Sequence, residues 1–271
     1  MESRSFTREI AGKNLIIETG KLAGQAAGAV TVRYGETVVL VTVCAGAKPV
    51  EGDFLPLTVD YEERLYAAGK IPGGFIRREG RPSQEATLAS RHTDRTLRPL
   101  LPKSWRREIQ VVVTVLSADQ ENSPEVLAII GASTAICISE IPFEGPIGAT
   151  RIGFNGELVV NPIFSQLQKG TLDLVVAGTR DAVVMVEAGA REVPEALLLE
   201  ALQVGQQVNQ ELVELQEEIV ARVGKPKMVF VPDAGPAPGL ASELAALVRG
   251  RVKALFDQGA AKGERNTLLD D

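Results

Sequence analysis

The chain has 271 residues, of which 45% are hydrophobic, so it can bury one substantial core or two modest ones. Its formal net charge of -6 argues by itself against a nucleic-acid partner. The charges are unevenly distributed, however: the segment 64–107 holds 11 of the chain's 29 Lys and Arg but only 3 of its 35 Asp and Glu. Such a positive segment is typical of a protein that focuses an anionic ligand at one place, although the same arginines could pair with carboxylates elsewhere in the fold.

The N-terminus and the cysteines indicate a reducing, cytoplasmic protein with no membrane partner. The first residues, "MESRSFTREI", contain no apolar run and no cleavage site. The most apolar stretch, "VLAIIGASTAICISEI", is short for a membrane span and interrupted by hydroxyls. Cys44 and Cys137 match no metal or redox spacing, and both are expected to be small core residues.

The first half of the chain reads as strands followed by helices. "TVRYGETVVLVTVCAGA" predicts a hairpin that turns at residues 34–36, and "FLPLTVDY" predicts a further strand. A helix is expected from Pro82 and Ser83 to about Arg98, followed by a buried strand in "EIQVVVTVLSAD". "NSPEVLAIIGASTAICISEI" predicts a second helix with Ser123 as its N-cap, in which small residues at 131–133 allow close packing on a sheet.

The second half predicts two hairpins and a long helix. One hairpin turns at Asn155-Gly156, and "TLDLVVAGTRDAVVMVEAGA" forms the other, before a helix over about 192–222. The chain is therefore expected to have an α+β fold with two βαβ-type parts, 5–142 and 146–224, then a Pro/Gly-rich linker over 225–238. Residues 239–271 would begin an all-α domain that the sequence does not complete, with a helix from about 240 to 257.

The stretch "GGFIRREGRPS", residues 73–83, has the composition of a loop that binds single-stranded nucleic acid. An aromatic side chain that stacks on a base, together with arginines that contact the backbone, holds such strands without sequence preference. The candidate RNA-binding residues are Phe75, Arg77, Arg78 and Arg81.

Arg91, Arg95 and Arg98 form a second candidate site, because their spacing places them on one stripe of the following helix. Guanidinium groups bind two phosphate oxygens at once, so the stripe predicts an anion pocket. The alternative is a network with Asp94, Glu85 or distant carboxylates. His92, the only histidine, is expected on the helix surface rather than as a base, and the sequence has no nucleophile–His system, Walker loop or zinc spacing.

Three long motifs resemble bacterial polynucleotide phosphorylases, the polyribonucleotide nucleotidyltransferases: "GGFIRREGRPSQEATLASRHTDRTLRPLLP", "SADQENSPEVLAIIGASTAI" and "DLVVAGTRDAVVMVEAGA". The resemblance runs from about Phe6 to Gly224. It implies a phosphorolytic 3'-to-5' exoribonuclease that degrades mRNA, releases nucleoside diphosphates and forms a homotrimer. Each subunit of the family has two RNase PH-like cores, a helical linker domain and C-terminal RNA-binding domains. This chain would supply the first core, an RNase PH-like βαβ core with mixed sheets packed on helices, and the start of the linker domain.

The resemblance places catalysis in the second core, so this chain is expected to contain no catalytic and no metal-binding residue. Active copies have phosphate-holding serines at the start of the central helix, where this chain has Pro124 and Glu125. They also have an Asp-x5-Asp-x-Lys pattern, of which only Asp173 is present, with Leu167 and Val175 at the other positions. A lone carboxylate cannot hold Mg²⁺ against its hydration shell. Mg²⁺ and the co-substrate inorganic phosphate are therefore expected to act in the second core.

The resemblance also gives the loop a role at the neck of the trimer channel, where Phe75 would stack on a base while Arg77 and Arg78 contact phosphates. Ile76 stands where many relatives have a second Phe. The arginine stripe would be a vestigial phosphate pocket, and other RNA-degradation proteins are expected partners.

The sequence raises two alternative functions. A single-core RNase PH that trims tRNA ends would need the Asp pair and phosphate site that this sequence lacks. A non-enzymatic RNA-binding subunit of an exosome-like ring stays open, and the sequence after Asp271 would distinguish it from the enzyme.

Overall fold

The computed structural model describes residues 2–73, 80–230, 239–259 and 262–270. The chain divides into two compact units, Met1–Phe230 and Val231–Asp271. Each is described by itself below.

The first sheet of the N-terminal unit has six strands in the order β1-β2-β3-β4-β6-β5. All neighbours are antiparallel except β5 and β6, which are parallel and joined through helix α1. The strands are β1 (Arg4–Ile10), β2 (Lys13–Thr19), β3 (Gly28–Tyr34), β4 (Thr37–Pro49), β5 (Leu57–Glu63) and β6 (Arg107–Ser117).

The pattern of β4 explains how this sheet buries one face. Val39, Val41 and Val43 are fully buried, whereas the residues between them are partly exposed, as the two-residue period of a strand requires. The β3–β4 hairpin turns through Gly35, whose φ of +62° is easily adopted only without a side chain. Cys44 follows Val43 on the opposite face and is exposed, so the prediction that it is a core residue was wrong; Cys137 is buried as predicted.

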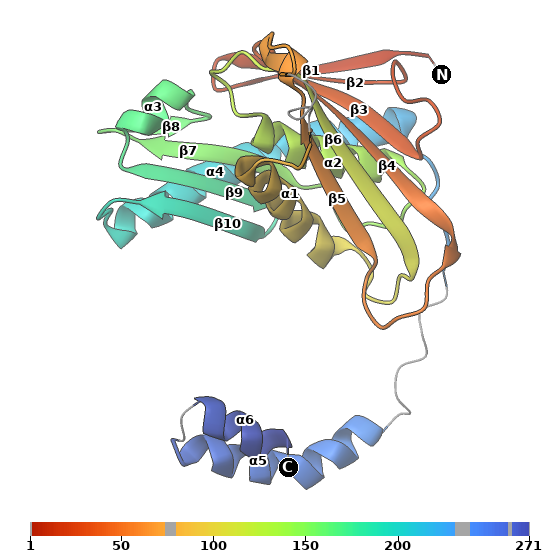
Figure 1. Cartoon of the computed structure of the whole chain (residues 1–271), viewed down its shortest axis with the longest axis vertical. Helices are drawn as coiled ribbons and strands as arrows, with labels where there is room; N and C mark the ends of the chain where they lie inside the picture. The colour runs from red at the N-terminus through yellow and green to blue at the C-terminus, as the bar shows by residue number, and fades with distance from the viewer. Residues whose placement is uncertain (1, 74–79, 231–238, 260–261, 271) are drawn as a thin grey trace. The chain divides into compact units, whose positions relative to one another are not determined.

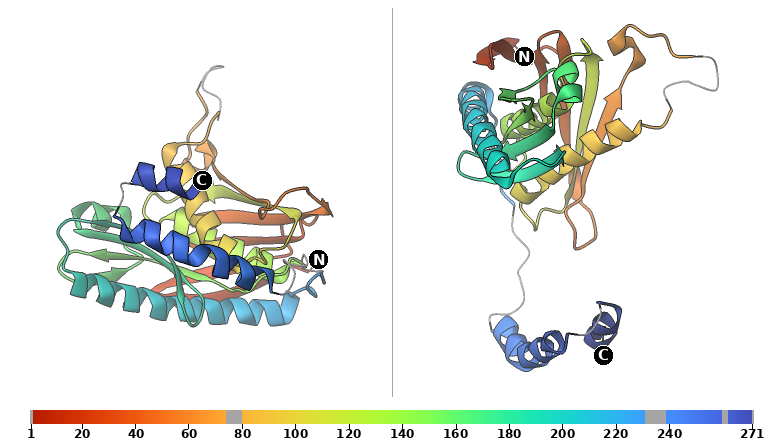
Figure 2. Two further views of the ribbon diagram at one scale, coloured as in Figure 1. Left: turned by 90° about the horizontal axis from the view of Figure 1, so that it is seen from below. Right: turned by 90° about the vertical axis from the view of Figure 1, so that its left-hand side faces the viewer.

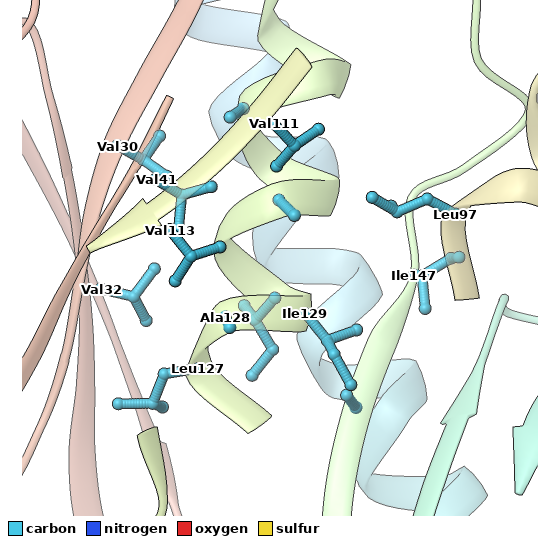
Figure 3. Packing of buried hydrophobic residues seen from close by; sticks show 14 of the residues in the cluster. Val30, Val32, Val41, Leu97, Val111, Val113, Leu127, Ala128, Ile129 and Ile147 are labelled. Atoms are coloured by element: carbon cyan, nitrogen blue, oxygen red, sulfur yellow. The ribbon is translucent and has the colours of Figure 1, made fainter. Parts of the chain in front are cut away.

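Helix α2 (Pro124–Ile138) forms the centre of the core, with every residue from Val126 to Ile138 buried. Such an all-round apolar helix must be covered on all sides. It packs on β3, β4 and β6 on one side and on α1, α4 and β7 on the other. Figure 3 shows Leu127, Ala128 and Ile129 between the valines of the first sheet and Ile147 beyond. Gly131 permits the close approach, because a Cβ there would lie 2.6 Å from Cγ2 of Val41.

The second sheet has four antiparallel strands in the order β10-β9-β7-β8, so mixed pairing is confined to the first sheet. Helix α4 packs against β7 and β9 and runs along one side of the unit (Figure 2). The elements are β7 (Gly148–Phe154), β8 (Leu158–Val160), β9 (Leu172–Gly178), β10 (Val183–Ala190) and α4 (Glu195–Val223).

Two buried polar side chains attach α4 to this sheet. Asn209 accepts a hydrogen bond from Thr150 Oγ1 at 2.7 Å and donates to the carbonyl of Val176 at 3.2 Å. Gln216 donates to the carbonyl of Ile147 at 2.7 Å. These partners fix the position of the helix, and those of Asn209 also satisfy an amide that would be costly to bury alone.

Helix α1 (Gln84–Leu97) lies between the two sheets, where it contacts β5, α2 and β10 (Figure 1). Ser83 caps it by accepting a hydrogen bond from the Ala86 amide at 2.9 Å. The described part of this unit also contains the short helices η1 (Leu65–Ala68), η3 (Arg98–Leu100) and α3 (Phe164–Lys169).

Residues 225–230 lie on this first unit although their composition predicts a linker. The amide of Lys225 donates to the carbonyl of Ile138 at 3.0 Å, and that of Met228 donates to Glu140 at 2.7 Å. Phe230 meets Trp105 edge-on at 5.5 Å between ring centroids. The unit boundary therefore falls after Phe230, and the rest of the expected linker lies outside the described residues.

The second unit contains α5 (Leu240–Asp257) and α6 (Lys262–Asp270), which contact each other. The predicted helix over 240–257 is confirmed, whereas α6 was not predicted. Nowhere in the described ranges is a helix both long and apolar enough to cross a bilayer. The expected α+β class is confirmed, as are the predicted hairpins at 34–36 and 155–156.

Candidate functional site

The candidate RNA-binding loop has both of its ends attached to the core. Phe75, Ile76, Arg77 and Arg78 lie outside the described residues, so their predicted contacts stay predictions. Before them, the carbonyl of Ala67 accepts a hydrogen bond from the Ala118 amide at 2.9 Å. After them, the Ser83 hydroxyl that caps α1 donates to Glu63 at 3.1 Å.

Arg81 is exposed and lines an open hollow of about 650 Å³ beside the loop. Arg64 and Lys70 line the same hollow, but so do Glu62 and Glu63, and Arg64 is paired with Glu62. The hollow therefore combines cations with two carboxylates. Arg81 is the one candidate RNA-binding residue that the structure describes, and its contact with RNA stays a prediction.

The arginine stripe on α1 is divided between different partners. Arg98 donates to both carboxylate oxygens of Asp94, at 2.9 and 2.6 Å, and to the carbonyls of Leu55 and Leu57 at 3.0 and 3.1 Å. Arg95 donates to Glu187 on β10 at 2.7 Å. These contacts match the alternative in which the stripe pairs with Asp94 and with carboxylates distant in the sequence.

Arg91 is exposed and contributes its charge to the same neighbourhood. The hydrogen bond from Arg95 lowers the pKa of Glu187 below its ordinary value, with smaller contributions from the charges of His92, Arg95 and Arg91. Glu187 is therefore a carboxylate partner for this part of the stripe. An additional anion at Arg91, Arg95 and Arg98 stays a prediction.

The residues at the expected catalytic position form a network around Arg151, which β7 presents beside the start of α2. Arg151 donates from Nε and Nη2 to the two carboxylate oxygens of Asp173, at 2.7 and 2.6 Å. Its Nη1 lies 3.1 Å from the hydroxyl of Ser123 and 3.5 Å from Glu125. Burial lowers the pKa of Arg151, but its hydrogen bonds to Asp173 and the charges of Asp173 and Glu125 outweigh this and raise it.

Glu125 joins this network to α1 through His92. Its Oε1 contacts Nδ1 of His92, whose Nε2 lies 3.7 Å from Glu187. His92 is only 9% exposed, so the prediction that it lies on the helix surface was wrong.

The charge of Glu125 also acts on Tyr61. The pKa of Tyr61 is raised mainly by burial and further by the charges of Glu63 and Glu125.

The residues present do not fit a magnesium site. Both oxygens of Asp173 are occupied by Arg151, while Val175 is buried and Leu167 lies on α3. Across the part of the chain that the structure describes, no three His, Cys, Asp or Glu side chains are grouped to hold a metal. The network has paired charges in place of an open coordination position or a free nucleophile.

A second cluster fixes the loop that leads into α2. Asp119 accepts hydrogen bonds from the Thr37 hydroxyl at 3.0 Å and from the amides of Glu36, Glu121 and Asn122 at 3.1, 2.9 and 2.8 Å. Burial raises the pKa of Asp119, but these hydrogen bonds together lower it well below its ordinary value. Asp119 therefore holds the start of α2 against the β3–β4 turn.

Sequence reasoning missed Arg151 and the pairing of His92 with Glu125. The one available signal was a charged residue inside the apolar strand "GATRIGF", since a buried arginine requires acidic partners. The partners themselves come from α1, α2 and β9, and no local pattern connects them.

Comparison with known proteins agrees with this fold. The profile of the 3' exoribonuclease family, domain 1, matches residues 11–142, and that of domain 2 matches residues 145–208. The crystal structure of rice Rrp46 is similar with a TM-score of 0.61 over 81% of this chain and 94% of the rice chain. The sequence identity is 13%, so this likeness concerns the fold alone.

The chain is also similar to proteins named polyribonucleotide nucleotidyltransferase. The one from Dehalococcoides mccartyi is 56% identical over 92% of this chain, that from Thermomicrobium roseum 60% over 83%, and that from Thermus thermophilus 49% over 99%. This chain spans only 35%, 29% and 38% of their respective lengths. The resemblance noted in the three sequence motifs is thereby confirmed, and the chain belongs to the 3' exoribonuclease family, with both of that family's domains in order.

Proposed function

We propose that this chain is the N-terminal part of a phosphorolytic 3'-to-5' exoribonuclease that converts RNA and phosphate to nucleoside diphosphates in the cytoplasm and degrades mRNA. It would contribute the first of two RNase PH-like cores in each subunit of a homotrimer. Its similarity to polyribonucleotide nucleotidyltransferases over most of its own length supports this assignment.

Within that enzyme this core is non-catalytic. The observation that carries this part of the proposal is the double hydrogen bond between Arg151 and Asp173, at 2.7 and 2.6 Å. It neutralises the one carboxylate that matches the expected Asp-x5-Asp-x-Lys pattern. Mg²⁺ and inorganic phosphate would act in the second core, which lies beyond this chain.

Catalytic inactivity of this core is tested by comparing residues 1–271 alone with the full-length protein. Single-stranded RNA is incubated with phosphate and Mg²⁺, and nucleoside diphosphates are measured by chromatography. We expect release by the full-length protein and none by residues 1–271. Phosphate-dependent release by the pure chain would contradict the proposal.

The role proposed for this core is to bind single-stranded RNA through Phe75, Arg77, Arg78 and Arg81. In the full-length protein, Phe75→Ala should weaken RNA binding by about 1–3 kcal/mol, the usual contribution of one base stack. Arg77→Ala and Arg78→Ala should each reduce the salt slope of binding by roughly 0.7. Arg180→Ala is the matched control, because Arg180 is an exposed arginine that pairs with Glu214 and Glu217 on the second half of the core.

Substrate length separates this role from misfolding. The loop variants should degrade long RNA less processively while keeping most activity on very short RNA. A misfolded variant would lose both activities and melt at a lower temperature. Parent-like binding and degradation of long RNA by all three loop variants, at several salt concentrations, would overturn the proposed role.

A further inference from the structure

Three positively polarised groups converge on the carboxylate of Glu125 at the start of α2. His92 contacts Oε1 from α1, and Arg151 Nη1 lies 3.5 Å from Oε2 on the side of β7. Glu125 itself stands in the first turn of α2, where the helix dipole favours negative charge. Its side chain is only 18% exposed, so these groups surround a carboxylate that is largely removed from water.

Other carboxylates contact the two side chains that face Glu125. Asp173 binds Arg151 through two parallel hydrogen bonds and thereby fixes the plane of its guanidinium. Glu187 lies 3.7 Å from His92 Nε2 and accepts a hydrogen bond from Arg95 at 2.7 Å. The guanidinium of Arg151 therefore keeps its orientation independently of Glu125.

Ser123 supplies a separate observation. It occupies the N-cap position of α2, yet its side chain makes no capping hydrogen bond. Its hydroxyl lies instead 3.1 Å from Arg151 Nη1. A hydroxyl, a guanidinium, an imidazole and the uncapped start of a helix are together the donor set that proteins use for tetrahedral oxyanions.

We propose that Glu125 is the resident anion of an oxyanion-binding site formed by Arg151, His92, Ser123 and the start of α2. The side chain occupies the place of a ligand, so the site accepts inorganic phosphate only when the Glu125 carboxylate is removed. This inference rests on the proposed lack of catalytic activity in this core. The site itself requires neither RNA nor assembly of a trimer.

The competing interpretation is a structural ion-pair network with no capacity for a ligand. The two interpretations differ in one measurable respect. Removal of the Glu125 carboxylate leaves Arg151 and His92 without their shared partner in both cases, but only an oxyanion site regains stability from an external phosphate.

The test compares Glu125→Ser with the parent in thermal unfolding and in calorimetric titration, using phosphate against chloride at matched ionic strength. Glu125→Gln is the matched control, because it removes the charge but keeps the side chain that fills the site. We expect Glu125→Ser to melt lower than the parent in chloride and to recover in phosphate. Its dissociation constant for phosphate should be on the order of 1 mM, at least tenfold tighter than for the parent or Glu125→Gln.

A second variant and a refolding measurement complete the test. The double variant Glu125→Ser/Arg151→Gln should lose the response to phosphate. If Glu125→Ser does not fold in chloride, it is refolded from urea in phosphate, where the proposal requires a recovered unfolding transition. The proposal is overturned if phosphate stabilises Glu125→Ser no more than chloride does. It is also overturned if phosphate stabilises the double variant as much as it stabilises Glu125→Ser. No RNA or nuclease activity enters the measurement, so its failure is distinct from failure of the proposed function.

Discussion

Replacing Arg151 by Met should destabilise the N-terminal unit far more than replacing a surface arginine of similar pairing. The Arg151 side chain is 16% exposed and binds both oxygens of Asp173. Removing one member of a buried ion pair costs about 3–5 kcal/mol, because the remaining charge is left without a partner. Asp173 is 39% exposed and can be partly hydrated, so the loss should be lower, about 2–4 kcal/mol.

Arg180→Met is the matched control. Arg180 also contacts two carboxylates, those of Glu214 and Glu217, at 3.4 and 2.6 Å, but its side chain is 44% exposed. Exposed pairs contribute about 0–1 kcal/mol, and salt screens them. The two substitutions remove the same charge and introduce the same side chain, so the difference between them reports burial.

The free energy of unfolding is measured by urea titration at low and high salt. The slope of the titration is compared among the variants so that a change in cooperativity is detected. A double-mutant cycle with Asp173→Asn should give a coupling energy of about 1–3 kcal/mol between residues 151 and 173. If Arg151→Met costs no more than Arg180→Met, or if the coupling vanishes, then the network does not stabilise the junction of α2, β7 and β9.

Three further outcomes follow from the packing and the titration of the N-terminal unit. Gly131→Ala should cost about 1–3 kcal/mol in a urea titration, because its Cβ would lie 2.6 Å from Val41, whereas Gly189→Ala on β10 of the same unit has open space and should be neutral or stabilising; equal effects would refute the close packing of α2. Asp119→Asn should cost about 1–3 kcal/mol at pH 7. The lowered pKa of Asp119 means that its contribution is fully present above the unfolded pKa near 4 and is lost progressively as the pH falls from there toward the lower pKa of the folded state. The difference in stability between parent and variant should therefore shrink steadily as the pH is lowered below about 4, and a constant difference would contradict this assignment. Burial raises the pKa of Cys137 to about 12, so an alkylating reagent followed by mass spectrometry should modify the exposed Cys44 first and reach Cys137 only on unfolding.

The sequence by itself determined the elements whose signals are local. The predominantly apolar run over 126–138 favours a helix covered on every side, and Ser123-Pro124 marks where it begins. Asn155-Gly156 specifies its hairpin, since few residues adopt the backbone that the turn requires, and Gly156 has a φ of +87°. The resemblance at Pro124 and Glu125 predicts that this helix start does not hold phosphate as active copies do, and this stays a prediction.

Only the tertiary structure decided which side chains meet. Cys44 lies in a strand that is apolar on both faces, so its exposure depends on which face α2 covers. His92 is buried where α2 and β10, both distant in sequence, pack against α1. Arg151, Glu125 and Asp173 come from three different elements, and their charges are stable inside the protein only as partners of one another. Desolvation makes that pairing obligatory, and the fold alone supplies the distances at which it forms.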